Sequence, residues 1–307
     1  MDPRGGGVTT DLIFCVDAGG THCRGRLAAD TGATLSEAED GPCNPATDVD
    51  RAAASLAGLW AGCASRAGHD PAERARVTLA LGGAGLSVPA ARSGLLAAAP
   101  QFGRAVVMSD GYAALIGASG GAPAGLIIAG TGVAGHRLFA DGTSIERDGW
   151  GWIGGDRGSG AWIGQRALRH ALAVADGLVP RDGLAEAVFA ALRAMSPTPR
   201  GWVPLLGPER LGAMAPLVLH AAEAGESAAL AIRDRAAAHL AALAGALALD
   251  PDAPLFLAGG LADSLRPLVA QRLGRAIAVP AADAREGCRL VAIGAAPEER
   301  VRDEARP

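Results

Sequence analysis

Two short glycine-rich turns have the residue types that hold phosphate groups. The first, Asp17–Thr21, places a carboxylate before two glycines and a hydroxyl, and the second, Gly130–Gly132, has a threonine between two glycines. Glycines expose backbone N–H groups to an anion, and a carboxylate such as Asp17 can hold Mg²⁺ through water. Each turn alone indicates only a tight turn. Two turns in matching places would suit a nucleotide tail cradled from both sides.

Asp110 is a candidate general base. It follows a predicted strand in the sequence Ser109-Asp110-Gly111, directly before a predicted helix. An Asp in this place is more commonly a helix N-cap. Open α/β sheets, however, bind their ligands outside the carboxyl ends of the strands, so its carboxylate could also take a proton there. Both interpretations are open from the sequence.

The stretch 148–164 is dense in glycine, carries three tryptophans and includes Asp148 and Asp156. Glycine permits positive φ and close backbone approach to a ligand, and tryptophan offers a wide apolar face. A carboxylate in such a loop can accept hydrogen bonds from hydroxyl groups. We therefore predict a ligand-binding loop, followed by a helix that Ser159 caps. The alternative is a glycine-rich surface turn whose indoles fill the core.

Composition excludes several kinds of site. All 28 basic side chains among the 307 residues are arginine. A Walker A loop and a protein-kinase fold each need a lysine, as does Schiff-base chemistry. The net charge of -4 gives no reason to expect nucleic-acid binding, and the broken apolar runs predict no membrane span. The five cysteines lack CxxC spacing and are expected to be reduced.

The predicted elements alternate between strands and helices. Strands are expected at Leu12–Val16, Cys23–Ala29, Ala33–Glu39, Arg76–Leu81, Ala105–Met108, Leu126–Ala129, Ala134–Ala140, Thr143–Arg147, Leu255–Ala258 and Ala276–Val279. Helices are expected at Val49–Arg66, Pro89–Ala98, Gly111–Ala118, Ser159–Ala175, Leu184–Met195, Pro208–Ala224, Ser227–Ala248, Ala262–Leu273 and from Gly287 to about Arg300, with a loop at Ser196–Pro204.

One order of elements occurs twice. Leu12–Gly32 and Leu126–Gly142 each run from an apolar strand through a Gly/Thr turn and an arginine-containing strand to an Asp-and-Gly hairpin. An internal repeat of this kind predicts two domains of one topology.

Five motifs together carry a resemblance to known proteins. They are Asp17-x-Gly-Gly-Thr21, Gly130-Thr131-Gly132, Gly149-Trp150-Gly151, Gly155-Asp156-x-Gly158-Ser159 and Leu257-Ala258-Gly259-Gly260. In this order and spacing they resemble the N-acetylglucosamine kinase group of the sugar kinase/Hsp70/actin superfamily and the related BadF/BadG/BcrA/BcrD ATPase family. The likeness runs from about Leu12 to Ala295.

The resemblance implies an α/β, two-domain actin-like ATPase (ribonuclease H-like) fold with duplicated βββαβα topology and an interdomain cleft. The N-terminal domain would comprise 1–120 plus a C-terminal helix at 288–307, and the C-terminal domain would comprise 121–287. It also implies a cytoplasmic homodimer without nucleic-acid or membrane partners.

The activity implied is ATP-dependent phosphorylation of an amino sugar, converting N-acetylglucosamine to N-acetylglucosamine 6-phosphate. Asp110 matches the catalytic base, and Asp17 would anchor Mg²⁺. The matching sugar-contacting positions are Asn44, Asp110, Gly149, Trp150 and Asp156. The matching ATP contacts are Asp17, Gly19, Gly20, Thr21, Thr131, Gly132, Gly225, Gly259 and Gly260. Arg157 stands where relatives often carry Glu, which reverses the charge beside Asp156.

Four other functions compete with this one. Glucosamine is an alternative acceptor. A BadF-type ATPase that activates a partner enzyme needs cysteines in a dedicated iron–sulfur motif, which this sequence lacks. A sugar-responsive repressor needs a helix-turn-helix, and only about ten residues precede the first predicted strand. A non-catalytic sugar-binding module stays open.

Overall fold

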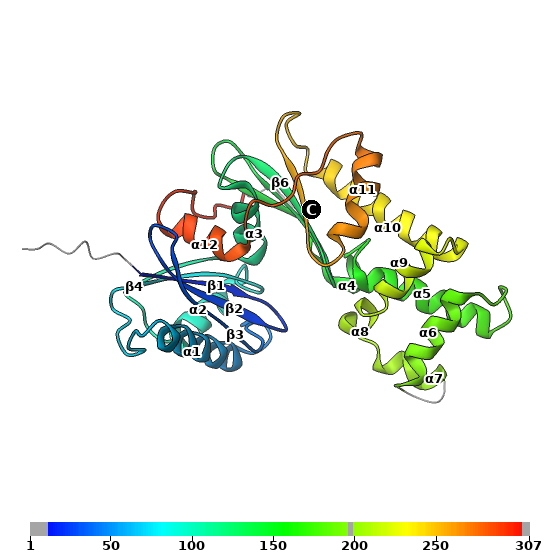
Figure 1. Cartoon of the computed structure of the whole chain (residues 1–307), viewed down its shortest axis with the longest axis horizontal. Helices are drawn as coiled ribbons and strands as arrows, with labels where there is room; N and C mark the ends of the chain where they lie inside the picture. The colour runs from blue at the N-terminus through cyan, green and yellow to red at the C-terminus, as the bar shows by residue number, and fades with distance from the viewer. Residues whose placement is uncertain (1–11, 196–198, 303–307) are drawn as a thin grey trace, which may run out of the picture. The chain divides into compact units, whose positions relative to one another are not determined.

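The computed structural model describes residues 12–195 and 199–302, which form two compact units (Figure 1). The first unit comprises the chain up to Pro123, the segment Leu138–Ser144 and the chain from Pro280 onward. The second comprises Ala124–Arg137 and Ile145–Val279.

The first unit is built on a five-stranded sheet in the order β3-β2-β1-β4-β5. Its strands are β1 (Leu12–Ala18), β2 (Cys23–Ala29), β3 (Thr34–Asp40), β4 (Val77–Gly83) and β5 (Arg104–Ser109). β1 pairs antiparallel with β2 and parallel with β4, and β4 pairs parallel with β5. The continuous apolar run in β1 fits this central position, because helices cover both faces of the sheet there.

Four helices cover this sheet: α1 (Val49–Arg66), α2 (Pro89–Ala98), α3 (Asp110–Ser119) and α12 (Ala284–Ala292). α1 and α2 lie on one face, and α3 and α12 lie on the other (Figure 1). α1 starts at Asp48, whose side chain accepts a hydrogen bond from the Arg51 N–H at 3.0 Å. Phe14 and Trp60 pack edge to face at 5.3 Å in the core below it. The strand before α3 is therefore covered by helices on both faces of the sheet.

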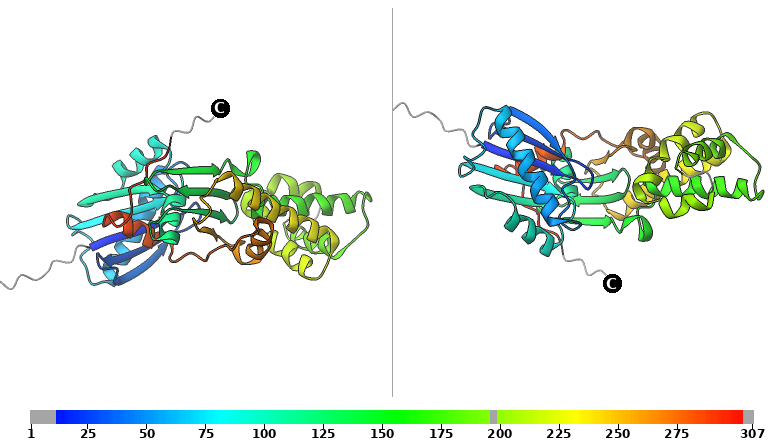
Figure 2. Two further views of the ribbon diagram at one scale, coloured as in Figure 1. Left: turned by 90° about the horizontal axis from the view of Figure 1, so that it is seen from above. Right: turned by 90° about the horizontal axis from the view of Figure 1, so that it is seen from below.

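The second unit has a four-stranded sheet in the order β8-β7-β6-β9, with β6 and β9 parallel. Its strands are β6 (Ala124–Ala129), β7 (Val133–Leu138), β8 (Ser144–Asp148) and β9 (Leu255–Ala258). Its helices are α4 (Gly151–Gly154), α5 (Gly160–Ala175), α6 (Gly183–Arg193), α7 (Pro199–Trp202), a 3-10 turn at Val203–Leu205, α8 (Pro208–Gly212), α9 (Ala215–Glu223), α10 (Ser227–Ala246) and α11 (Ala262–Leu273). The green and yellow helices of Figure 2 pack against one another in one group.

The two sheets share the order of their corresponding strands, β3-β2-β1-β4 in the first and β8-β7-β6-β9 in the second. This confirms the predicted α/β class with a duplicated topology. In each, the first strand of the unit lies between its hairpin partner and a parallel strand that comes later in the chain. The proposed domain limits and the cleft stay predictions.

Several predicted elements were wrong in detail. Pro208–Ala224 is two helices, α8 and α9, because the chain turns between Gly212 and Ala215. The predicted strand Ala276–Val279 is reduced to one bridge between Phe256 and Ala278. The terminal helix begins at Ala284, capped by Asp283, and ends at Ala292. Within the predicted loop, Pro199–Trp202 is helical, while residues 196–198 lie outside the described part of the chain.

Candidate functional site

The first turn is open to solvent. The Gly19 N–H donates to the His22 carbonyl at 3.0 Å, and a Cβ at Gly19 would lie 2.7 Å from that oxygen, so the turn requires glycine there. Nothing lies within 4 Å of a Cβ placed at Gly20, and both Gly20 and Thr21 are exposed. The turn therefore presents backbone and hydroxyl groups outward, as an anion contact requires.

Asp17 precedes this turn at the end of β1. Its Oδ2 accepts a hydrogen bond from Arg24 Nη2 at 2.6 Å, and its side chain is one-fifth exposed. That hydrogen bond raises the pKa of the Arg24 guanidinium above its ordinary value. The carboxylate is thus already paired with one cation, and it keeps solvent access for water-mediated contact with a second.

Asp110 is the first residue of α3, and Ser109 is the N-cap: the Ser109 hydroxyl accepts from the Tyr112 N–H at 3.2 Å. The interpretation of Asp110 as the cap is therefore wrong. Loss of hydration raises the pKa of the Asp110 carboxyl, and the charge of Asp17 adds to that rise, while the Gly111 N–H opposes it. The residue nevertheless keeps exposed surface, so its desolvation is partial.

Glu299 holds the start of α3, a contact that the sequence reasoning missed. Its Oε2 accepts from the Ser109 N–H at 2.8 Å, and its Oε1 accepts from the Ser109 hydroxyl at 2.6 Å. Nearby, the Tyr112 hydroxyl donates to the Pro297 carbonyl at 2.8 Å. The chain after α12 therefore fixes the turn that positions Asp110.

Asn44 lies against the turn that follows β4. Its Oδ1 accepts from the Ala46 N–H at 3.0 Å, and a Cβ at Gly85 would lie 2.3 Å from the same oxygen. Gly85 has φ 79°, which also favours glycine. Asn44 is only half-buried, so its amide group can still meet a ligand.

The second turn is held by the start of a helix. Gly130 closes the turn by donating to the Gly132 carbonyl at 2.9 Å, and its own carbonyl accepts from the Gly160 N–H at 2.8 Å. The Thr131 carbonyl accepts from the Ala161 N–H at 3.1 Å. These carbonyls satisfy N–H groups that a helix leaves without intrahelical partners. A Cβ at Gly212 of α8 would lie 3.4 Å from the Thr131 methyl.

The Asp156 side chain contacts the residue that follows the second turn. Only 8% of its surface is exposed, and its Oδ1 accepts from the Val133 N–H at 3.2 Å. Its own N–H donates to Asp148 Oδ1 at 2.9 Å, and its backbone has φ 55°. Burial raises the pKa of the Asp156 carboxyl, and the Asp148 charge adds to the rise. The structure thus gives Asp156 a local role that sequence reasoning did not foresee.

The loop before Asp156 turns sharply. Asp148, Gly149 and Gly151 have φ of 61°, 72° and 79°, and the Gly149 N–H donates to the Val133 carbonyl at 3.1 Å. α4 forms inside this stretch, and Trp150 before it is 61% exposed. The Trp150 indole therefore does not fill the core. For this tryptophan, the alternative of a surface turn whose indoles fill the core is wrong. Trp152 and Trp162 are partly buried against the core.

The remaining residues predicted to contact the nucleotide are three glycines of the second unit, Gly225, Gly259 and Gly260. Gly259 has φ 93°, and a Cβ there would lie 2.4 Å from the Ala129 carbonyl, so the end of β9 packs directly on the end of β6. A Cβ at Gly260 would meet nothing within 4 Å. Gly225 has φ 86° and follows α9, in open space. Gly260 and Gly225 therefore leave room for a ligand.

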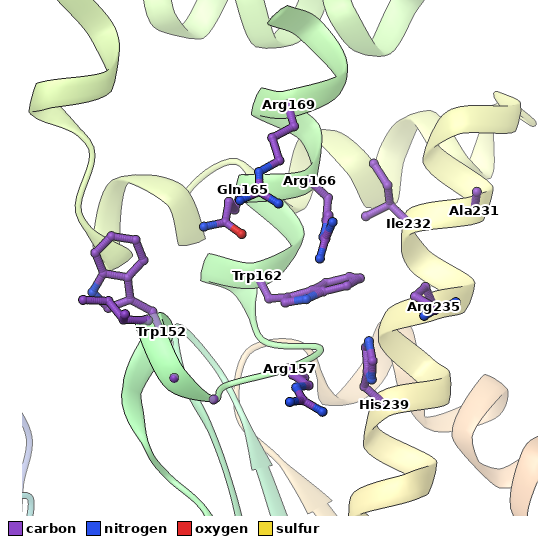
Figure 3. Close-up of a pocket in the computed structure, with 13 residues that line it drawn as sticks. Trp152, Arg157, Trp162, Gln165, Arg166, Arg169, Ala231, Ile232, Arg235 and His239 are labelled. Carbon is purple, nitrogen blue, oxygen red and sulfur yellow. The ribbon is translucent and has the colours of Figure 1, made fainter. Parts of the chain in front are cut away.

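A pocket of about 970 Å³ lies wholly in the second unit (Figure 3). Its walls come from the loop after β8, from α5 and from α10. The lining side chains are rich in arginine and include Trp152, Arg157, Trp162, Gln165, Arg166, Arg169, Ile232, Arg235 and His239. The sequence reasoning noted Arg157 but did not find the other arginines.

The described residues contain no cluster of three or more His, Cys, Asp or Glu side chains that could hold a metal ion. Among them there is also no helix with the length and apolar character needed to cross a membrane.

The comparison with protein families decides the relationship. The sequence model of the BadF/BadG/BcrA/BcrD ATPase family matches residues 15–296 of this chain. The chain belongs to this family. The predicted resemblance is therefore confirmed.

Individual relatives cover nearly the whole chain. Glucosamine kinase GspK of Vibrio cholerae is 26% identical over 277 residues, which span 90% of this chain and 94% of that protein. A crystal structure of a candidate N-acetylglucosamine kinase from Chromobacterium violaceum is 31% identical, with a TM-score of 0.85 over 92% of this chain and 99% of that one. A ROK-family glucokinase from Streptomyces griseus, 18% identical with a TM-score of 0.53 over 93% and 99% of the two chains, shares the fold.

Proposed function

We propose that the protein is an ATP-dependent kinase that phosphorylates the 6-hydroxyl of an amino sugar, with N-acetylglucosamine as the acceptor. The observation that carries this proposal is Asp110: it is exposed, it begins a helix at the end of a parallel strand, and it is not used as that helix's cap. Membership of an ATPase family and the two kinase relatives support it.

Phosphoryl transfer requires that the protein position the two reactants, neutralise charge on the phosphates and accept the proton of the attacking hydroxyl. In the proposed reaction, the Asp110 carboxylate accepts the proton of the sugar hydroxyl as the bond from that oxygen to the γ-phosphorus forms. The phosphorus–oxygen bond to the β-phosphate breaks, and ADP leaves. Ser109 and Glu299 orient Asp110 by fixing the first turn of α3. Loss of hydration raises the pKa of the Asp110 carboxyl, which makes its carboxylate a stronger base than that of an exposed Asp.

Mg²⁺ would neutralise charge on the β- and γ-phosphates when bound. The first turn fits such an ion, because Asp17 offers one partly exposed carboxylate and Mg²⁺ prefers few carboxylates and several waters.

The nucleotide contacts are proposed from both turns. Gly19, Gly20 and Thr21 would contact the phosphates from the first unit, and Thr131 and Gly132 from the second. Gly225, Gly259 and Gly260 would contact the adenosine side. The open space at Gly20, Gly225 and Gly260 supports this assignment.

Sugar contacts are proposed for Asn44, Asp110, Gly149, Trp150 and Asp156. Exposed Trp150 and half-buried Asn44 have surface for such contacts. The Asp156 Oδ1 atom accepts a hydrogen bond from the Val133 N–H. We propose that Oδ2 contacts the sugar while Oδ1 holds the loop.

N-acetylglucosamine is favoured over glucosamine by the charge near this loop. Glucosamine carries a cationic ammonium group when protonated, and Arg157 lies next to Asp156 with three further arginines in the adjoining pocket. Like charges at such sites repel. The Vibrio relative is a glucosamine kinase, which keeps glucosamine as the alternative acceptor.

An activator of a partner enzyme is the second family alternative. All five cysteines are free and buried within the first unit, so none is displayed for a shared iron–sulfur cluster. We propose further that the protein acts in the cytoplasm as a homodimer, which sedimentation of the purified chain would test.

The decisive experiment is ATP consumption across a panel of amino sugars and hexoses, with and without EDTA. We expect ADP release that requires N-acetylglucosamine and divalent metal, and ³¹P NMR should locate the phosphate on the 6-oxygen. ATP hydrolysis that no sugar stimulates would reject the kinase and favour the activator alternative.

A further inference from the structure

The arginine pocket of Figure 3 has an unusual charge. Four guanidinium groups line it, from Arg157, Arg166, Arg169 and Arg235, and no Asp or Glu is among its lining residues. The whole chain, by contrast, carries a net charge of -4. The pocket is therefore a local concentration of positive charge on an acidic protein.

These four arginines form no ion pair with a carboxylate of the described residues, whereas several other arginines do. Among residues 12–195 and 199–302, no carboxylate forms an ion pair with any of the four. Elsewhere, Arg289 pairs with Glu286 at 2.6 Å and Arg302 with Asp141 at 2.7 Å. Gathered like charges destabilise a fold unless an anion offsets them.

Two helix faces create this arrangement. On α5, Trp162, Arg166 and Arg169 follow one another at helical spacing, so they lie on one side of the helix. On α10, Arg235 and His239 do the same. Figure 3 shows these two faces turned toward the same space, with Arg157 reaching in from the loop before α5.

Two aromatic rings, those of Trp162 and His239, also line the pocket. The Arg166 guanidinium lies 5.0 Å from the centre of the Trp162 ring, and the His239 ring meets the same indole edge-on at 5.1 Å. Loss of hydration lowers the pKa of His239, and the charges of Arg235, Arg157 and Arg166 lower it further. The charge of Asp148 opposes this shift, and the pKa of His239 nevertheless stays below its ordinary value.

We propose that this pocket binds a phosphorylated small organic molecule. Planar guanidinium forks match phosphate oxygens bidentately, and four of them can offset the charge of one or more phosphate groups. The volume of about 970 Å³ lies in the range of pockets for small-molecule ligands. The indole of Trp162 supplies an apolar surface for the organic part.

This binding does not depend on the proposed kinase activity, although it adjoins the loop that carries Trp150 and Asp156. A sugar phosphate and a nucleotide share the required chemistry, and tripolyphosphate represents the phosphate chain of the second. Occupancy by the first would link the pocket to sugar metabolism, and occupancy by the second would link it to nucleotides.

The test is calorimetric titration without ATP or acceptor sugar. The probes are N-acetylglucosamine 6-phosphate, sodium tripolyphosphate and inorganic phosphate, each added to the full chain. The pocket variant combines Arg166→Gln with Arg235→Gln. The matched control combines Arg51→Gln with Arg76→Gln, which removes the same charge from exposed arginines of the first unit.

We expect wild type to bind one of the two larger probes more tightly than inorganic phosphate. The pocket variant should lose at least about tenfold in affinity, because each charged hydrogen bond contributes on that scale. The control should change little, since exposed single charges are screened. Thermal melts must show that neither variant is less stable than wild type.

Three results would overturn the proposal. In the first, no probe binds wild type at millimolar concentration. In the second, the pocket and control variants bind equally well, which would place the anion elsewhere, including at the glycine turns. In the third, sedimentation shows self-association that only the pocket variant loses while no probe binds, which would make a second copy of the chain the occupant. None of these outcomes decides whether the protein is a kinase.

Discussion

The two glycine turns occupy matching places in the two sheets, yet their surroundings differ. The first turn is exposed, and the carboxylates near it, Asp17 and Asp110, keep solvent access. The second is bonded to the first turn of α5 and rests on the buried carboxyl of Asp156. A duplicated topology therefore does not duplicate roles: the first turn leaves its carboxylates available for chemistry, while the second uses its carboxylate for its own structure.

The largest effect should come from Asp110→Asn. Asn keeps the shape of Asp but cannot take a proton, so we expect kcat to fall by ~10²–10⁴-fold. Because Ser109 and not Asp110 caps α3, stability should hardly change. Steady-state kinetics and a thermal melt measure both quantities. An active Asp110→Asn enzyme would remove the proposed difference between the two turns.

The pH dependence of wild type sharpens the same prediction. The pKa of Asp110 is raised, so the base becomes protonated at a higher pH than an ordinary Asp. Activity should therefore decline on the acid side beginning above the usual Asp range. The acid limb should be missing from the residual activity of Asp110→Asn, and a limb of unchanged position would assign it to another group.

A second difference concerns histidines close to the turns. His22 in the first turn is exposed, whereas His136 on β7 is 7% exposed, and burial lowers its pKa to about 4. The unfolded chain then binds the proton more tightly than the folded one, so stability should fall as pH drops from about 6.5 to about 4. The loss should reach about 3 kcal/mol over that window.

Urea unfolding at several pH values measures this loss. His136→Gln should flatten the dependence, because it removes the group that must charge on unfolding. His220→Gln is the control, since His220 is exposed in the same unit. Equal pH profiles for wild type and His136→Gln would show that other groups dominate the acid sensitivity.

Asp156→Ala should reveal the structural use of the second carboxylate. It leaves the buried Val133 N–H without its acceptor and places Ala at positive φ, so we expect a loss of about 1–3 kcal/mol in unfolding free energy. If Asp156 also contacts the sugar, KM for the acceptor should rise steeply. Asp156→Asn separates the two, because Asn tolerates this backbone conformation and keeps an oxygen acceptor. An unchanged KM in Asp156→Ala would leave only the structural role.

The sequence predicted those features that local patterns determine. The bounds of α1, α2 and α11 are confirmed: Asp48 caps α1, Pro89 is the first residue of α2, and Gly274 follows α11 in the left-handed conformation. The two turns and the repeated strand order also follow from local patterns. Glu299 could not be connected to Ser109 in this way, since 190 positions separate them and only the fold brings them together. The arginine pocket joins α5 to α10 for the same reason. The roles of the site residues remain predictions.

The smallest effects, and the most direct test of the contrast, come from alanine at one glycine in each turn. A Cβ at Gly132 would lie 2.9 Å from Asp156 Oδ2, and that carboxylate cannot move without straining its bond to Val133. We therefore expect Gly132→Ala to cost about 1–2 kcal/mol. A Cβ at Gly20 meets nothing within 4 Å and Gly20 has no positive φ, so Gly20→Ala should stay within about 0.5 kcal/mol of wild type. Gly20→Ala should instead raise KM for ATP, because the new methyl group stands where phosphate must approach the backbone. Chemical denaturation and ATP titration of both variants provide the comparison. If both lose stability equally, the first turn is as tightly packed as the second, and its proposed openness to a nucleotide is wrong.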